Sequence, residues 1–338
     1  MRDEKLDIFR GLAMMWVISV HCLYWLEYFS WHKSFFLTEM SLFFFIAGAS
    51  NGMASKKSLG SFYVNRFRRI LIPYWIYGVI CIALISIFRT PETIKGFGNL
   101  VYSWANPFVS SRSTILYLPR AVWFVPVYLL VMLAFPLFEK IRNTRMRYLP
   151  LIALFLGIVA LDFFGIGGKI SYYAKMFVFY GFFTYFGLFF TEITKKIQFL
   201  PACAVIAIAL LSMVALVTFF GQSLDMQNNK FPPNTMFFSY SLAALAILYI
   251  FSDSIIYAIK FLRSNVFFDW IYQQYVQRGM TIFLFHPFVF LLLGYLKKTC
   301  FAGVNQGISF AVILLLAIPL SAVIGKMFSW VERFNKSI

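Results

Sequence analysis

Apolar runs of about 20 residues, the length that crosses a bilayer as a helix, recur along the whole of this 338-residue sequence. Each run is continuous and does not alternate between apolar and polar residues, which favours helices over the strands of a β-barrel. We expect about ten transmembrane helices, at residues 6–27, 35–54, 72–88, 121–138, 149–165, 174–190, 200–220, 236–252, 280–296 and 308–330. The pattern predicts an all-α, polytopic integral membrane protein with one transmembrane domain, residues 1–338.

Composition agrees with a chain whose main solvent is membrane lipid. Hydrophobic residues make up 61% of it and charged residues 13%, against about 45–50% and about 25% in soluble domains. The net charge of +17 would suggest nucleic acid as a partner of a soluble protein. In a membrane protein, basic residues gather in cytoplasmic loops that face anionic lipid, so we expect no nucleic acid partner. The four cysteines form no CxxC pair, and we predict no metal site.

The distribution of Lys and Arg predicts the orientation of the chain. Basic residues are more frequent in the alternate connections that include both ends, so both termini are expected in the cytoplasm. Two connections are long. Residues 89–120 are expected outside, and residues 253–279, which mix apolar and polar side chains, are expected inside as an interfacial amphipathic helix.

The first apolar run contains ionisable side chains, which are costly in a membrane and usually functional. Arg10 and His21 are 11 positions apart, about 20° from three full helical turns and about 16 Å along the axis, so they share one face. Asp7 precedes Arg10 by three positions and lies on that face. Arg10 could be an interfacial anchor, and His21 could simply bond to another helix. As a pair, they predict a site in which His21, an imidazole with an ordinary pKa of about 6.5, is the general base.

A cluster of arginines precedes the third predicted span. Arg66, Arg68 and Arg69 lie in the connection before Pro73, which is expected to open that helix. Such a cluster could only signal topology. Because guanidinium groups hold phosphates by paired, directed hydrogen bonds, it also predicts a phosphate-binding site.

Four further residues are candidates for supporting or substrate-binding roles. His286 precedes Pro287 in the ninth predicted span; the proline accounts for a kink but not for the histidine. Trp123 could anchor the membrane interface or stack on a sugar. Glu39 enters the second span from outside, and Lys230 lies in an outer connection beside two prolines, where it could form a rigid rim.

These segments resemble the motifs of the acyltransferase 3 family of membrane-bound O-acyltransferases. The likeness covers nearly the whole chain, and five motifs occur in order: LDIFRGLAMMWVISVHC (6–22), SLFFFIAGAS (41–50), RFRRILIPYW (66–75), VWFVPVYLL (121–129) and IFLFHPF (282–288). Arg10 and His21 are similar to the arginine and histidine of the family's opening motif. By this resemblance both would be catalytic, and Arg66 and Arg69 would help to hold coenzyme A.

The resemblance implies a ten-helix enzyme that moves an acyl group, usually acetyl, from cytoplasmic acetyl-CoA or another acyl-CoA. The acceptor would be a sugar hydroxyl of an extracytoplasmic or lipid-linked glycan, and the location a bacterial plasma membrane. A transporter or flippase for a glycan or small anion is the alternative, because intramembrane Arg and His also suit transport. A third alternative is a membrane scaffold, in which Arg10 and His21 could be replaced without effect.

Overall fold

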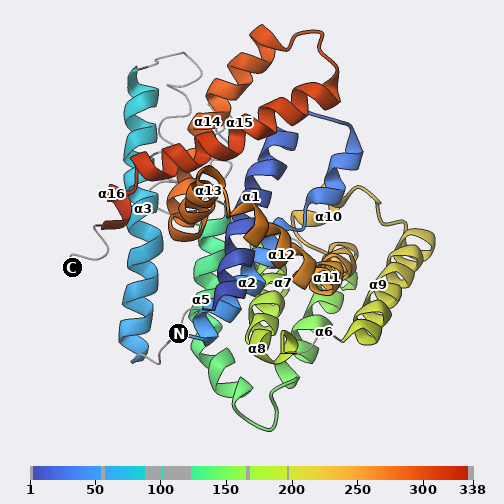
Figure 1. The fold of residues 1–338 in the computed structure, drawn as a ribbon. Helices are drawn as coiled ribbons and strands as arrows, with labels where there is room; N and C mark the ends of the chain where they lie inside the picture. The colour runs from blue at the N-terminus through green and yellow to red at the C-terminus, as the bar shows by residue number, and fades with distance from the viewer. Residues whose placement is uncertain are drawn as a thin grey trace. The chain divides into compact units, whose positions relative to one another are not determined.

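The computed structural model describes residues 3–54, 58–87, 101, 123–164, 168–195 and 198–333. These residues form α-helices joined by short connections, and no β-strand occurs among them (Figure 1). The all-α prediction is confirmed. The predicted outer loop 89–120 lies, apart from Val101, outside the described residues.

Within the described part of the chain, six helices are long and apolar enough to cross a membrane. They are α1 (Glu4–Trp25), α3 (Leu59–Ile87), α5 (Phe124–Arg142), α9 (Phe199–Phe220), α14 (Gly279–Cys300) and α15 (Gln306–Met327). A seventh span is possible if α11 (Thr235–Ile250) and α12 (Ser252–Leu262), which are bent by 63°, cross together. The chain is therefore a polytopic membrane protein. The number ten and the cytoplasmic termini stay predictions.

The other predicted spans correspond to shorter or less apolar helices. These are α2 (Glu39–Gly52), α6 (Leu149–Phe163) and α7 (Lys169–Gly187). With 14 and 15 residues, α2 and α6 are shorter than the about 20 residues that cross a bilayer core. The small elements η1 (Trp31–Phe36), α8 (Phe190–Ile193) and α10 (Met226–Lys230) occupy connections.

Two boundary predictions are wrong. Pro73 does not open the third span: α3 begins at Leu59, and Pro73 lies inside it. Pro73 deprives this helix of only one hydrogen bond, to the carbonyl of Arg69, and spanning helices tolerate such a loss. The connection 253–279, predicted to lie inside, forms two helices, α12 and α13 (Val266–Gln277), where we expected one.

The described residues fall into two compact units, and the prediction of a single domain stays a prediction. The first unit comprises residues 1–13, 30–56 and 133–269, and the second comprises residues 14–29, 57–132 and 270–338. The start of α1 belongs to the first unit and its end to the second, although the helix is continuous.

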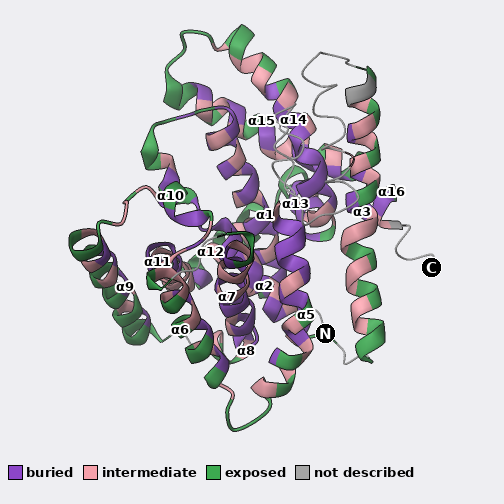
Figure 2. Ribbon diagram, turned by 180° about the vertical axis from the view of Figure 1, so that it is seen from behind, coloured by how far each residue is buried: buried purple, intermediate pink, exposed green. Residues whose placement is uncertain are grey.

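Close packing of α2 against α7 forms the centre of the first unit. A Cβ atom on Gly48 would lie 1.9 Å from the carbonyl oxygen of Thr184, and one on Gly187 would lie 2.0 Å from that of Phe45. Small residues at these two points let the backbones approach, as is common between membrane helices. Both helices are largely buried, whereas α9 is mostly exposed (Figure 2). Only 17% of the most apolar 18-residue stretch of α9 is buried. We infer that α9 faces lipid.

A buried ion pair joins α10 to the start of α2 in the first unit. Lys230 at the end of α10 donates to the carboxylate of Glu39 at the start of α2, and both side chains are almost fully buried. The two residues were selected separately from the sequence, and the structure brings them together. The Lys230 ammonium therefore joins α10 to α2 through a carboxylate partner inside the unit. Its part in a rigid rim stays a prediction.

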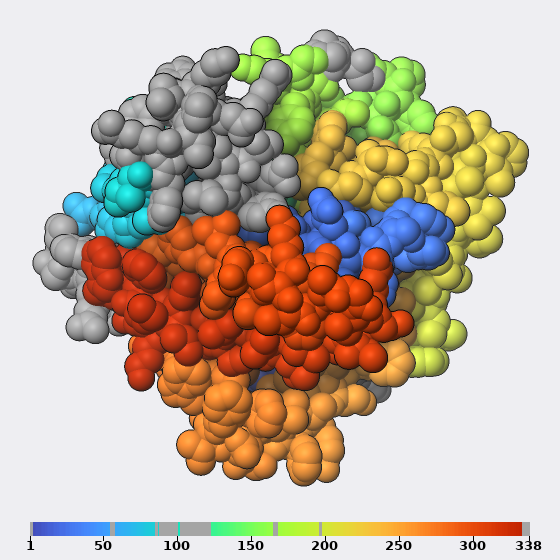
Figure 3. Space-filling view, turned by 90° about the horizontal axis from the view of Figure 1, so that it is seen from above, coloured from blue at the N-terminus to red at the C-terminus, as the bar shows by residue number. Residues whose placement is uncertain are grey.

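In the second unit, α14 and α15 pack along each other and join with the end of α1, α3 and α16 (Trp330–Arg333). A Cβ atom on Gly325 of α15 would lie 2.4 Å from the Ile282 side chain of α14. Figure 3 shows α14, α15 and the segment between them as one continuous orange-to-red surface. The Thr281 hydroxyl donates to the Glu332 carboxylate at 2.5 Å, which ties α14 to α16.

The Glu39–Lys230 pair gives a test of the first unit. Glu39→Gln leaves the Lys230 ammonium buried without its carboxylate, so we expect the free energy of unfolding to fall by about 3–5 kcal/mol. Unfolding in detergent, followed by circular dichroism, measures the change. The double variant Glu39→Gln, Lys230→Met should recover much of the loss. Lys298→Met, which removes an exposed cation, is the control, and equal stability of Glu39→Gln and this control would contradict a structural pair.

Candidate active site

Two histidines from distant parts of the sequence meet in the second unit. His21 of α1 and His286 of α14 approach through Nδ1 and Nε2, respectively, at 2.6 Å. Their ring centroids are 4.8 Å apart and their planes differ by 12°. The imidazoles therefore lie edge to edge in nearly one plane, the geometry of a hydrogen bond between ring nitrogens. Sequence reasoning selected both residues but did not pair them.

Pro287 explains why a histidine precedes it. A proline has no N–H, so Pro287 cannot donate to the carbonyl of Phe283, four positions earlier in α14. Nδ1 of His286 lies 2.7 Å from this carbonyl oxygen and 3.1 Å from that of Ile282. The imidazole thus takes the place of the missing backbone donor. Pro287 and His286 therefore act together: the proline leaves the Phe283 carbonyl without a backbone donor, and the histidine supplies one.

These contacts determine where the hydrogens of the two rings lie. Nδ1 of His286 faces carbonyl oxygens, which only accept, so it carries the hydrogen. His286 is fully buried, where an uncompensated charge is costly, and the neutral ring then has its lone pair on Nε2. Nδ1 of His21 must donate to that lone pair. In neutral His21 the lone pair therefore lies on Nε2, the nitrogen directed away from His286.

Trp25 supports both imidazoles. Its ring is stacked on His21, with centroids 4.2 Å apart and planes at 9°, and also on His286, at 5.1 Å and 12°. Phe290 meets Trp25 edge to face at 5.4 Å. His21 is partly exposed, whereas Trp25 is buried. The indole orients the pair through these ring contacts. Its position four residues after His21, hence on the same helix face, is the signal that could have found it.

The turn after α1 holds this part of the helix in place. Lys297 of α14 donates to the carbonyl of Leu26, and its ammonium lies over the ring of Tyr28. The hydroxyls of Tyr28 and Ser309 are 2.6 Å apart. Glu27 and Phe29 have positive φ angles of 54° and 55°, a region that non-glycine residues seldom occupy. Contacts to α14 and α15 thus hold a turn that is locally unfavourable.

Arg10 lies in the first unit with its own partners. Its guanidinium donates to the Asp7 carboxylate at 2.7 Å and to the Ser50 hydroxyl of α2 at 2.8 Å. The contact to Asp7 follows from their i,i+3 spacing on one helix face. α1 is helical from Glu4 to Trp25, so Arg10 and His21 belong to one uninterrupted helix.

The three arginines of the basic cluster lie on α3 in the second unit, and the helix separates them. Arg66 and Arg69, three positions apart, share a face, whereas Arg68 points to a different side. Arg66 is partly buried with its guanidinium over the Phe62 ring at 5.5 Å, and Arg68 and Arg69 are exposed. The prediction that these arginines lie in a connection before the third span is wrong, because α3 begins at Leu59 and includes all three. Their role in phosphate binding stays a prediction.

A comparison with protein families bears on these residues. The family model of the acyltransferase domain, acyltransferase 3, matches residues 3–326. The chain belongs to the acyltransferase 3 family. Curated proteins and solved structures gave no significant match. This acyltransferase 3 protein is thus a multi-pass membrane acyltransferase.

The other candidates of this acyltransferase 3 protein are divided between the two units. Glu39 and Lys230 form the buried ion pair of the first unit. Trp123 immediately precedes α5 in the second unit. Its neighbour Phe124 meets Phe283 of α14 edge to face at 5.2 Å. Phe283 lies three positions before His286, so the residue after Trp123 packs one helical turn from that histidine. Its proposed stacking role stays a prediction.

The histidine pair predicts a positioning role for His286 in this acyltransferase 3 protein. His286→Phe removes the acceptor that holds the Nδ1 hydrogen of His21, so kcat should fall by about 10²-fold or more with little change in KM. In His286→Gln the side-chain oxygen can accept the same hydrogen bond, and part of the activity should return. Steady-state kinetics of acyl transfer measures both. Equal loss in the two variants would contradict the positioning role.

Proposed function

We propose that this acyltransferase transfers an acyl group, with acetyl from acetyl-CoA as the expected donor, to a sugar hydroxyl of an extracytoplasmic or lipid-linked glycan in a bacterial plasma membrane. The observation that carries the proposal is the directed histidine pair. It leaves the lone pair of His21 on Nε2 of a partly exposed ring, while Nδ1 is held by His286. A nitrogen in this state suits removal of a proton from a hydroxyl.

The proposed reaction begins when the acceptor hydroxyl attacks the thioester carbonyl carbon. His21 Nε2 takes the hydroxyl proton as the new C–O bond forms, and the imidazolium that results keeps its Nδ1–H bond to His286. The C–S bond then breaks, and the proton passes from Nε2 to the sulfur. The products are an ester and free coenzyme A thiol. A second route, in which Nε2 first accepts the acyl group itself, uses the same nitrogen and stays open.

Arg66 and Arg69 are proposed to bind the phosphates of coenzyme A. In a regular helix Arg66 lies within about 20° of Tyr77 around the axis of α3. Tyr77 is buried and packs on Phe285 and Phe288 of α14, on either side of His286 in sequence. Arg69 and Arg66 lie about 12 and 17 Å from Tyr77 along α3. A nucleotide at these arginines would leave the extended arm of the cofactor to cover that distance.

Arg10 and Asp7 are proposed to take part through the family resemblance. The structure contributes the contacts to Asp7 and Ser50, which give the Arg10 guanidinium a defined direction. Replacement of Arg10 by Ala is expected to abolish transfer in a protein that still folds.

The general-base proposal predicts the behaviour of a His21 variant. His21→Ala should lower kcat by about 10²–10⁴-fold, because no other group takes the hydroxyl proton. The assay follows release of coenzyme A from labelled acetyl-CoA by protein in nanodiscs, with His32→Ala, an exposed histidine, as the control. Near-normal turnover in His21→Ala would contradict the mechanism. Acceptor flux that needs no acyl donor would instead support a transporter.

The helical arrangement of the arginines predicts unequal effects of similar substitutions. The variant Arg66→Gln, Arg69→Gln should weaken acetyl-CoA binding by about tenfold or more, since charge-assisted bonds to phosphate are lost. Arg68→Gln removes a cation two residues from Arg66 but on another face, and should bind nearly as the wild type does. Equilibrium binding of acetyl-CoA measures both. Equal affinity of all three proteins would contradict phosphate binding and leave membrane topology as the role of the cluster.

A further inference from the structure

The first unit contains a cavity that the proposed acyl transfer does not use. Its volume is about 510 Å³, within the range of about 300–1,000 Å³ typical of small-molecule sites. Apolar side chains from α2, α6, α7, α9 and α11 form most of its wall, among them Leu42, Phe45, Phe186, Val205 and Leu245. All lining residues belong to the first unit. The histidine pair belongs to the second.

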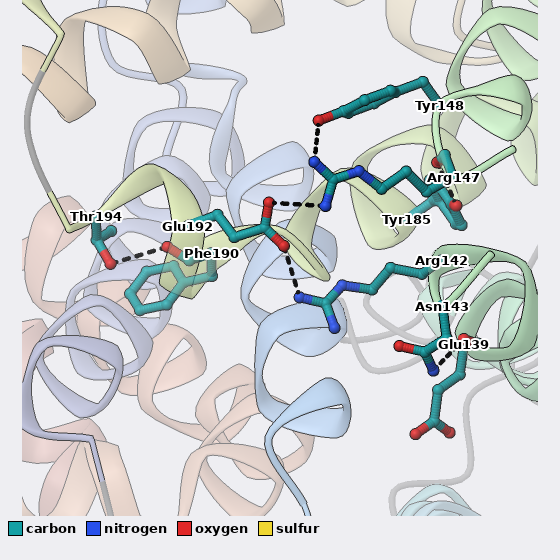
Figure 4. A network of polar contacts seen from close by, with 9 residues as sticks. All are labelled: Glu139, Arg142, Asn143, Arg147, Tyr148, Tyr185, Phe190, Glu192 and Thr194. Atoms are coloured by element: carbon teal, nitrogen blue, oxygen red, sulfur yellow. Dashed lines mark hydrogen bonds and ion pairs between the residues drawn. The ribbon is translucent and has the colours of Figure 1, made fainter. Parts of the chain in front are cut away.

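One edge of this apolar cavity carries charge. Glu192 of α8 and Tyr148, just before α6, are among the lining residues. Figure 4 shows the guanidinium groups of Arg142 and Arg147 directed at the Glu192 carboxylate, one to each oxygen, at 3.1 and 3.4 Å. Arg147 also donates to the Tyr148 hydroxyl at 2.7 Å. The edge therefore holds two cations and one anion.

The arginines keep donors for a further acceptor. A guanidinium group has five N–H donors, and Glu192 takes one from Arg142 and one from Arg147. The Nε of Arg142 is buried and has no hydrogen-bond acceptor among the described residues. A buried donor of this kind is unfavourable unless a ligand oxygen reaches it. An anion with several oxygens, such as a phosphate diester, matches this set of donors.

We propose that the cavity binds one acyl chain of an anionic glycerophospholipid, with the lipid phosphate at Arg142 and Arg147. An apolar chamber beside guanidinium groups is complementary to a molecule that has a hydrocarbon chain and a phosphate. α9, whose outer face is largely exposed, supplies Pro201, Ala202 and Val205 to the wall, so the bilayer itself is the nearest source of such a molecule. The neighbouring exposed cation Lys140 favours anionic over zwitterionic lipid.

Glu192 has a definite place in this proposal. Its carboxylate bridges the two arginines, so it competes with the phosphate for the same guanidinium groups. Removing its charge should therefore strengthen lipid binding. A purely structural ion-pair cluster gives no such gain, because loss of the carboxylate would only loosen the arginines. This opposite expectation distinguishes a phosphate site from a salt-bridge network.

The test measures binding of fluorescent phosphatidylglycerol to the full chain in detergent, with labelled phosphatidylcholine as the zwitterionic comparison. Wild-type protein should prefer phosphatidylglycerol. Arg142→Gln, Arg147→Gln should raise its Kd by about fivefold for each arginine, while Arg145→Gln, in the same connection, should not change it. Glu192→Gln should lower the Kd. Equal affinity for both lipids in the wild type, or equal Kd values in the two arginine variants, would overturn the proposal.

A second pair of variants tests the apolar part without touching the charges. Ala246→Phe adds a ring to the cavity wall, and should weaken phosphatidylglycerol binding while the arginines stay in place. Ala207→Phe adds the same ring to an exposed position of α9 outside the cavity, and should bind as the wild type does. Undiminished binding in Ala246→Phe, in protein that elutes as the wild type in size exclusion, would show that no chain enters the cavity and would overturn the proposal.

Discussion

Polar groups in a membrane protein have little water to bond to, so each one must find its partner within the chain, and this constraint shapes every cluster described above. The carbonyl of Phe283, which Pro287 cannot satisfy, receives a hydrogen from His286. His286 in turn accepts one from His21. A local defect of α14 thereby becomes the support of a directed imidazole. The hydrogen bond that the Phe283 carbonyl receives therefore also fixes the orientation of the two histidines in the candidate active site.

The same constraint accounts for the charged side chains elsewhere. Arg10 is held by Asp7 and Ser50, and Lys230 is held by Glu39. Each of these groups would be costly in an apolar interior without its partner. The partners lie on the same helix in the first case and on distant segments in the second. Arg142 differs, because its Nε lacks an acceptor among the described residues, and the phosphate of the proposed lipid would supply one.

Helix geometry also changed the meaning of residues that the sequence had grouped together. Arg66, Arg68 and Arg69 are neighbours in sequence, and a loop would let all three converge on one phosphate. On α3 only Arg66 and Arg69 share a face. A proline is most common at a helix start, but Pro73 lies inside α3, because the apolar surroundings of a spanning helix tolerate the loss of one backbone hydrogen bond.

Sequence alone determined the all-α membrane class, most helix positions and the identity of the ionisable residues, because hydropathy and helical periodicity are local properties of the chain. It also indicated the family through the order of its motifs. Tertiary structure alone decided that His21 meets His286, that Glu39 meets Lys230, and that Arg142 and Arg147 pair with Glu192 in the wall of an apolar cavity. Such pairs are separated by up to 265 positions, and no local pattern encodes which distant helices pack together.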